Sequence, residues 1–269
     1  MAGRLSGKVA IVTGAGSSGP GLGNGKATAV LFAREGARVL CVDQILGRAE
    51  ETVAVVAEEG GVAAALAADV SRRTDCAAMV AAAVEHYGRL DVLHNNVGVA
   101  SLQAIEQVTE DEWDRLMAVN LKSMLLAIQA AMPALDAAGG GSIVNVSSIA
   151  GIRYAGAALT TYSTTKAGII GLTISAAGQL GEKRIRVNCI APGLVYTPLV
   201  AAMLTPEARE RRRRGGLIPD EGTAWDVGWA AVYLASDEAR WVTGQVLVVD
   251  AGLTTTTREQ GFAAHGGER

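Results

Sequence analysis

The chain has 269 residues, of which 49% are hydrophobic and 19% are charged, and its formal net charge is −3. This composition suits a chain with a large buried core, and the small net charge gives no signature of a surface that binds nucleic acid or an anionic membrane. The sequence shows neither the roughly 18-residue apolar run of a membrane span nor the apolar core and cleavage site of a signal peptide.

Short apolar runs alternate with helical patterns as far as residue 252. Because the runs are rich in Val, Ile and Leu without polar alternation, they predict strands buried on both faces. These strands are expected at 9–14, 37–43, 62–69, 90–96, 141–148, 184–193 and 244–252. Helices are expected at 26–36, 48–59, 74–87, 111–135, 162–180 and 223–234, with Pro133 as a candidate break. The alternation predicts an α/β fold with a single domain spanning 1–269, a Rossmann-like, doubly wound parallel sheet of about seven strands with helices on both faces.

The first predicted strand runs into a glycine-rich stretch at 13–29. A literal GxGxxG pattern occupies 14–19, but a helix directly after it would carry three further glycines, at roughly 1 kcal/mol each. We therefore expect the helix to start after 23–25. Gly14 then turns out of the strand, Gly23 lets the backbone approach a diphosphate, and Gly25 allows the helix to pack closely on the strand. The alternative is a glycine-rich turn without a ligand.

Asp43 ends the second predicted strand, about twenty residues after the glycine loop, where a carboxylate can accept hydrogen bonds from adenosine ribose hydroxyls. It would also repel a 2′-phosphate, and no Arg or Lys follows it before Arg48. The sequence therefore predicts NAD rather than NADP. The alternative is an aspartate that only caps the next turn.

Candidate catalytic groups follow in the second half of the chain. Tyr162 and Lys166 are four residues apart in a predicted helix, so they share one face, and the ammonium should lower the pKa of the phenol. Such a phenol takes a proton from an alcohol or gives one to a ketone. Ser148 ends a strand and can polarise a substrate oxygen; alternation lets only one of Ser147 and Ser148 reach the site. The alternatives are a surface Tyr–Lys pair and, for Asn120 in mid-helix, an exposed side chain.

In their order and spacing, these motifs resemble the short-chain dehydrogenase/reductase family from about residue 8 to residue 252. The loop resembles the family's TGxxxGxG motif with five extra residues, roughly 18–22. The sequence NNVG at 95–98 resembles NNAG, and Asp69-Val70 resembles the pair that holds the adenine. Pro192-Gly193 with Thr197 resembles the segment at the nicotinamide end.

The resemblance implies a tetrad in which Tyr162 is the acid/base, Ser148 orients the substrate oxygen, Lys166 tunes Tyr162 and holds the nicotinamide ribose, and Asn120 holds a water for proton relay. The implied NAD contacts are Gly14, Ser17, Gly23, Asn24, Gly25, Asp43, Asp69, Val70, Asn96, Val97, Gly98, Tyr162, Lys166, Pro192, Gly193, Val195 and Thr197. It also implies a substrate-covering segment at 194–220, and a homotetramer that pairs the helices 111–135 and 162–180.

We therefore expect an NAD-dependent oxidoreductase that acts on a small secondary alcohol or ketone in the cytoplasm. The alternatives are a 3-oxoacyl-carrier-protein or acyl-CoA reductase with the same tetrad, and an NAD(H)-binding protein without turnover. No metal is expected, because the three histidines lack metal-ligand spacing, and the three separated cysteines indicate reduced thiols. No nucleic-acid or membrane partner is expected.

Three features remain open at this stage. The arginine-rich stretch 208–216 either recognises an acidic substrate or carrier phosphate, or forms a solvated helix face. Tyr154, Leu194, Tyr196 and Met203 either line an apolar pocket or pack elsewhere. The tail 253–269 is polar and glycine-rich, so it either frays or packs on a neighbour.

Overall fold

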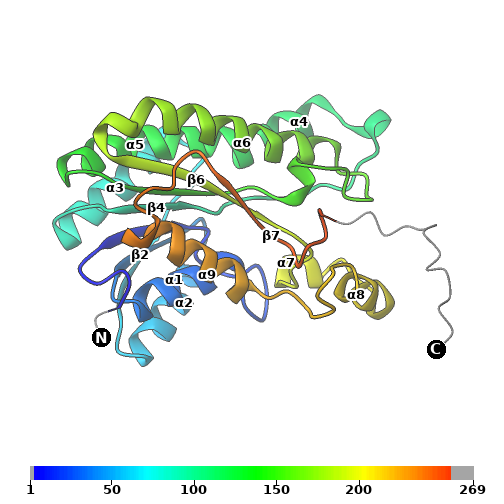
Figure 1. Ribbon diagram of the computed structural model, residues 1–269, viewed down its shortest axis with the longest axis horizontal. Helices are drawn as coiled ribbons and strands as arrows, with labels where there is room; N and C mark the ends of the chain where they lie inside the picture. The colour runs from blue at the N-terminus through cyan, green and yellow to red at the C-terminus, as the bar shows by residue number, and fades with distance from the viewer. Residues whose placement is uncertain (1–2, 256–269) are drawn as a thin grey trace, which may run out of the picture.

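The computed structural model describes residues 3–255, and its centre is one parallel sheet of seven strands (Figure 1). The strand order is β3-β2-β1-β4-β5-β6-β7. Their bounds are β1 Val9–Thr13, β2 Arg38–Asp43, β3 Val62–Ala67, β4 Val92–Asn95, β5 Gly141–Val146, β6 Ile185–Pro192 and β7 Val246–Val249. The order reverses direction between β1 and β4, the arrangement in which the carboxyl ends of the strands leave a crevice for a ligand. The predicted doubly wound fold is confirmed.

Helices cover both faces of the sheet (Figure 1). One layer contains α1 (Asn24–Arg34), α2 (Leu46–Glu58) and α9 (Ala224–Ala235), and the other contains α3 (Arg73–Tyr87), α4 (Glu110–Leu116), α5 (Ser123–Ala137) and α6 (Thr160–Leu180). Strand alternation supplies both cores, since Ala10 and Val12 pack in the first layer and Val9 and Ile11 in the second. The runs without polar alternation therefore fill two hydrophobic cores.

The predicted helix at 111–135 differs from expectation in two ways. A π-helical segment, Met117–Lys122, joins α4 to α5, and α5 continues through Pro133 to Ala137 without a break. Proline has no backbone N–H, so Pro133 cannot donate a hydrogen bond to the carbonyl of Gln129, four residues earlier. Because Gln129 is exposed, its backbone carbonyl can bind water instead. By length and composition the stretch Glu110–Ala137 could also cross a membrane. Here it packs against α3 and α6 as part of the helical layer.

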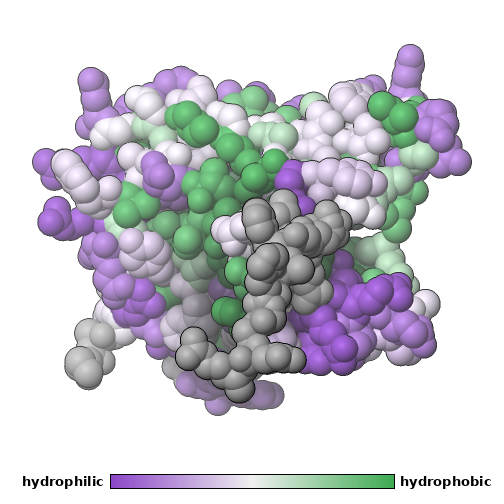
Figure 2. Space-filling view, turned by 45° about the vertical axis from the view of Figure 1, so that its right-hand side comes forward, coloured by the Kyte–Doolittle hydropathy of each residue, from purple (hydrophilic) through white to green (hydrophobic). Residues whose placement is uncertain are grey.

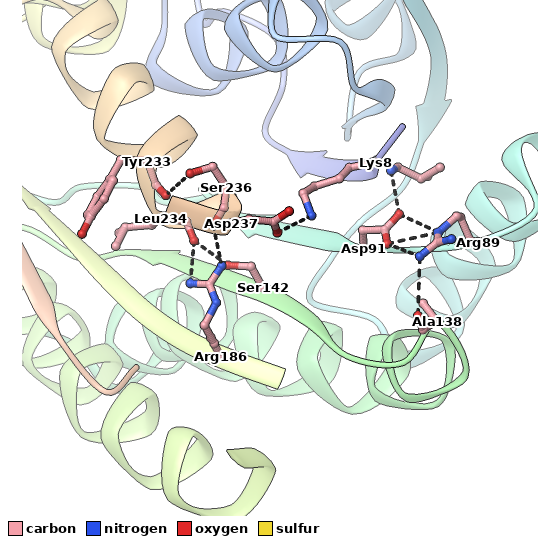
Figure 3. A network of polar contacts seen from close by, with 11 residues as sticks. Lys8, Arg89, Asp91, Ala138, Ser142, Arg186, Tyr233, Leu234, Ser236 and Asp237 are labelled. Carbon is pink, nitrogen blue, oxygen red and sulfur yellow. Dashed lines mark hydrogen bonds and ion pairs between the residues drawn. The ribbon is translucent and has the colours of Figure 1, made fainter. Parts of the chain in front are cut away.

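Polar side chains form hydrogen bonds and ion pairs at the amino ends of the strands (Figure 3). Arg186, near the start of β6, donates to the carbonyls of Leu234 at 2.8 Å and Ser236 at 3.1 Å, which end α9. Asp91, just before β4, accepts from the backbone of Val9 at 2.9 Å and is also bound by Arg89. These contacts stabilise the amino end of the sheet. The ligand crevice lies at the opposite end, where the carboxyl ends of the strands meet.

The irregular stretch predicted at 194–220 contains two short helices, α7 (Pro198–Ala201) and α8 (Pro206–Arg213). They follow β6 and lie beyond the carboxyl ends of the strands, at the right of Figure 1. The predicted tail begins with a short turn, and its part from residue 256 onward lies outside the described residues.

Candidate active site

A pocket of about 690 Å³ lies at the carboxyl ends of the strands. It is lined by every cofactor contact that the sequence predicts, from Gly14 to Thr197, and by Ser148, Tyr162 and Lys166 of the predicted tetrad. Of the predicted site residues only Asn120 is absent from the lining. The structure therefore brings together residues from both halves of the chain.

The glycine loop forms a close-fitting cradle at the start of α1. Gly14 has φ = +61°, a left-handed conformation that favours glycine. A Cβ on Gly25 would overlap the Gly14 carbonyl oxygen and come within 2.6 Å of Asn96 Nδ2, so only glycine permits this packing. The helix begins at Asn24, with Gly23 as its N-cap, which confirms the register chosen from helix propensity.

The N-terminus of α1 suits an anionic group. Its cap makes no side-chain hydrogen bond, its first turn has no acidic residue, and Asn24 Oδ1 has no partner among the described residues. First-turn N–H groups and the helix dipole favour a phosphate at such an end. These residues fit the diphosphate of a dinucleotide.

The five extra residues fold back without disturbing this cradle. The backbone N–H of Gly23 donates to Ser17 Oγ at 2.9 Å, so one hydrogen bond closes the loop across the insertion. Within the loop, Cβ atoms at Gly19 and Gly21 would lie 3.8 and 3.4 Å from Pro198 at the start of α7. The insertion therefore reaches toward the segment that covers the pocket.

At the adenosine end, Asp43 is fixed by two backbone donors. Its Oδ2 accepts from Gly16 and its Oδ1 from Ile45, both at 3.1 Å. Asp69 lines the same region, and its Oδ1 accepts from Ser71 Oγ at 2.7 Å. Sequence reasoning missed Arg48, which also lines the pocket, because its position five residues after Asp43 says nothing about where α2 turns it.

Asn96 ties β4 to the glycine loop. Its side-chain amide donates to the carbonyl of Gly14 at 3.1 Å, and its backbone N–H donates to Thr13 Oγ1 at 3.1 Å. The neighbouring Asn95 points into the protein instead and donates to Asn145 at 2.9 Å. Asn96 therefore positions the loop, and Asn95 joins β4 to β5.

The side chains of the two serines at the end of β5 point to opposite sides, as strand alternation predicts. Ser147 is buried and donates to the backbone carbonyl of Lys166 at 2.6 Å. Ser148 Oγ lies by the pocket, where it accepts from the Ala150 backbone at 3.1 Å. Ser148 is thus the serine available to a ligand.

Lys166 lies beneath Tyr162 in a confined position. Its Nζ lies 5.5 Å from the centre of the Tyr162 ring and donates to the carbonyl of Val146 at 2.9 Å. A Cβ on Gly98 would lie only 3.1 Å from Nζ, so Gly98 leaves room for the ammonium. Burial lowers the pKa of Lys166 to about 8, because a buried charge loses hydration.

The expected lowering of the Tyr162 pKa is wrong for the protein alone. Burial raises the pKa of this phenol, and the nearby Ser148 side chain offsets only part of that effect. The physical reason is that the phenolate loses its hydration in the buried site.

Asn120 is fully buried in the π-helical segment behind the pocket. Its Oδ1 accepts from the backbone N–H of Val99 at 2.8 Å, and its Nδ2 donates to the Val99 carbonyl and to Thr165 Oγ1. The alternative of an exposed asparagine is therefore wrong. π-Bulges often mark functional sites, but a single Asn in an apolar helix gave no signal for one.

The outer part of the pocket is mainly apolar. Leu194 and Met203 line it, whereas Tyr154 is 79% exposed and Tyr196 stacks under Arg209, so neither tyrosine belongs to the lining. Gly193 is required at this bend, since a Cβ there would lie 2.5 Å from the Cβ of Asp250.

The fold and the cradle define a Rossmann-type protein whose site suits a dinucleotide. A family model described as enoyl-(acyl carrier protein) reductase matches residues 21–254. The 3-oxoacyl-(acyl-carrier-protein) reductase of Thermotoga maritima is 38% identical over 250 residues, which cover 93% of this chain and 99% of the relative. The cyclohexanol dehydrogenase of an Acinetobacter species is 36% identical, with 95% and 98% of the two chains covered.

A solved structure of a dehydrogenase is also similar to this chain. A 7α-hydroxysteroid dehydrogenase, complexed with NADH and 7-oxo-glycochenodeoxycholic acid, superposes with a TM-score of 0.87 at 33% identity, covering 93% of this chain and 95% of its own. The chain belongs to the short-chain dehydrogenase/reductase family, as the resemblance predicted. A Rossmann-fold member of this family binds a nicotinamide nucleotide.

Proposed function

We propose that the protein transfers a hydride between NAD(H) and a secondary alcohol or ketone. The observation that carries this proposal is the meeting of Ser148, Tyr162 and Lys166 in the pocket that the glycine cradle opens into. A pure binding module has no need of these three groups at the end of its nucleotide site.

Each residue has a distinct task in this proposal. Tyr162 takes the proton of the alcohol hydroxyl during oxidation and returns it to the ketone oxygen during reduction. Ser148, which lines the same pocket as Tyr162, holds that same oxygen. The buried Lys166 places positive charge below the phenol and favours phenolate, while the nicotinamide, when bound, accepts or supplies the hydride. Asn120 acts by positioning the backbone of Val99 and the side chain of Thr165.

The preference for NAD rests on Asp43. Its carboxylate is held by two backbone N–H groups beside the cradle, where it can accept from ribose hydroxyls and would repel a 2′-phosphate. Arg48 lines the same part of the pocket and could pair with a 2′-phosphate, so it favours NADP. We give Asp43 the greater weight, because its position is fixed by hydrogen bonds.

The relatives suggest two classes of substrate. The T. maritima relative supports a 3-oxoacyl-carrier-protein reductase, and the cyclohexanol and hydroxysteroid dehydrogenases support cyclic alcohols. The apolar outer pocket suits either class.

The test is nicotinamide absorbance with cyclohexanone, a 7-oxo steroid and a 3-oxoacyl thioester, each with NADH and with NADPH. Tyr162→Phe should lose at least about 10²-fold in turnover while binding NADH as tightly as the wild type by fluorescence. The matched control is Tyr154→Phe, at a tyrosine 79% exposed and outside the pocket lining, which should keep full activity. Unchanged turnover in Tyr162→Phe would refute the assignment, and tight NADH binding without turnover of any ketone would favour a binding protein.

We also propose a homotetramer that works in the cytoplasm. A groove between α5 and α6 is lined by Leu121, Leu172 and the 40% exposed Leu125, and Ile174 on α6 is 55% exposed, which suits helix pairing between copies. The three cysteines are free and buried, as in a reducing compartment. Light scattering coupled to size-exclusion chromatography measures the assembly directly.

A further inference from the structure

The arginines of α8 have different surroundings. Arg209 is paired with Glu221 at 2.7 Å and stacked on Tyr196 at 3.7 Å from the ring centre, and Arg213 and Arg214 share Glu210. The Arg209–Glu221 pair ties α8 to the segment that follows it, whereas the pairs with Glu210 lie within the helix and at its end. The prediction of a solvated helix face is correct for these arginines.

Arg212 lies on the other side of the helix, one turn after the half-buried Ala208. It is half-buried, it lines the pocket, and none of the described carboxylates pairs with it. Its one hydrogen bond is a long one, from Nη2 to the Val195 carbonyl at 3.5 Å. Most of the guanidinium's donors are thus available to a ligand.

The surroundings of Arg212 are poor in polar groups. Leu194, Leu199, Met203 and Leu204 line the same part of the pocket, and burial lowers the pKa of Arg212. A charge that has lost hydration without gaining a partner is costly, and a bidentate oxyanion is the group that best restores its hydrogen bonds. In Figure 2, hydrophilic residues gather at the lower right, where α8 lies, and hydrophobic residues gather to the left of the grey segment.

We propose that Arg212 binds an anionic oxygen group of the substrate, a carboxylate or a phosphate, and so makes this an enzyme for acidic alcohols or ketones. This inference rests on the proposed function, since the reacting oxygen is placed at Ser148 and Tyr162. The anion lies at α8, on the covering side of the pocket.

The position of Arg212 favours the substrate over the cofactor diphosphate as the source of that anion. The diphosphate cradle is the N-terminus of α1, whose loop reaches Pro198 in α7. Arg212 belongs to the next helix and reaches Val195, in the segment predicted to contact the nicotinamide end. The reacting carbon of a substrate lies against that end.

The test compares matched acid and neutral probes: 4-oxocyclohexanecarboxylate and 5-oxohexanoate, each beside its methyl ester. The wild type should favour the acids by kcat/KM, and Arg212→Gln should lose roughly tenfold or more on the acids alone through a raised KM. Arg211→Gln, at an exposed arginine of the same helix, is the control and should behave as the wild type.

A second measurement needs neither turnover nor the variant. Calorimetry on the wild-type complex with NADH should show cyclohexanecarboxylate binding and cyclohexanecarboxamide binding at least roughly tenfold more weakly. If ketones are turned over but acids are not preferred, or if Arg212→Gln keeps the preference, the inference is wrong and the proposed function stands. If Arg212→Gln instead weakens NADH binding by the same factor, Arg212 serves the cofactor diphosphate. If no ketone is turned over, the calorimetric pair alone decides the inference.

Discussion

Replacing Gly25 with alanine should damage the nucleotide site and the fold together. The added Cβ would overlap the Gly14 carbonyl oxygen and lie 2.8 Å from its carbonyl carbon. The overlap with the oxygen is the closer of these contacts, and real Cβ atoms essentially never come within 3.0 Å of such an atom, so α1 and the loop must separate by more than roughly 1 Å. Overpacking of this kind costs about 1–3 kcal/mol of stability, and it shifts the N–H groups that face the diphosphate.

Gly47 offers a matched control, because it is the second residue of α2, as Gly25 is of α1. No atom lies within 4 Å of a Cβ at Gly47. Gly47→Ala should therefore raise stability by up to about 1 kcal/mol through helix propensity and leave NADH binding unchanged. Thermal unfolding and NADH fluorescence titration measure both effects. Wild-type melting and NADH affinity in Gly25→Ala would refute the argument that this position needs glycine.

Four further predictions follow from single contacts. Asp43→Ala should narrow the preference for NAD⁺ over NADP⁺, measured as the ratio of their kcat/KM values, and an unchanged ratio would remove Asp43 from cofactor choice. Because burial raises the pKa of Tyr162, the phenolate forms as pH rises, so alcohol oxidation should speed up toward alkaline pH and ketone reduction should slow down; flat profiles would count against Tyr162 as acid/base. The buried His94 has its pKa lowered to about 3 by desolvation, so it stays neutral in the folded protein while the unfolded chain takes up a proton below about 6.5. The free energy of unfolding should therefore fall by about 1.4 kcal/mol for each pH unit between 6.5 and 3. In urea unfolding at pH 5 and 7, His94→Leu should abolish this loss of stability at the lower pH. The control His86→Gln, at an exposed histidine, should keep it. Arg186→Met should cost about 2–3 kcal/mol by removing charged hydrogen bonds to the end of α9 yet keep the NADH dissociation constant, and loss of NADH binding would show that the two ends of the sheet are coupled.

The fold was predictable because it depends on patterns that are local in the chain. Buried parallel strands read as continuous apolar runs, and the cost of glycine inside a helix was enough to choose the start of α1. Alternation along β5 separated Ser147 from Ser148 for the same reason. These features need only backbone geometry and a period.

Other features depend on how distant segments meet, and the sequence could not predict them. The π-helical segment around Asn120 is shaped by contacts with Val99 and Thr165, which lie 21 and 45 residues away. Arg48 enters the pocket through the direction in which α2 leaves β2. The pKa of Tyr162 is raised by burial, and the spacing YxxxK says nothing about how deeply the phenol is buried.

The contacts that stabilise the sheet and the helix proposed to select the substrate lie at opposite ends of the strands. Arg186 and Asp91 join strands and helices at the amino ends, where losing a buried partner is expensive. At the carboxyl ends, α8 is held by surface ion pairs such as Arg209–Glu221, which contribute little to stability because solvent screens them. Residues of α8 can therefore change at little cost to folding, and substrate choice can vary while the cradle and the catalytic residues stay fixed. Two relatives at 36–38% identity are named for substrates as different as a 3-oxoacyl-(acyl-carrier-protein) and cyclohexanol, and Arg212, which we propose binds the substrate's anionic group, belongs to this easily varied helix.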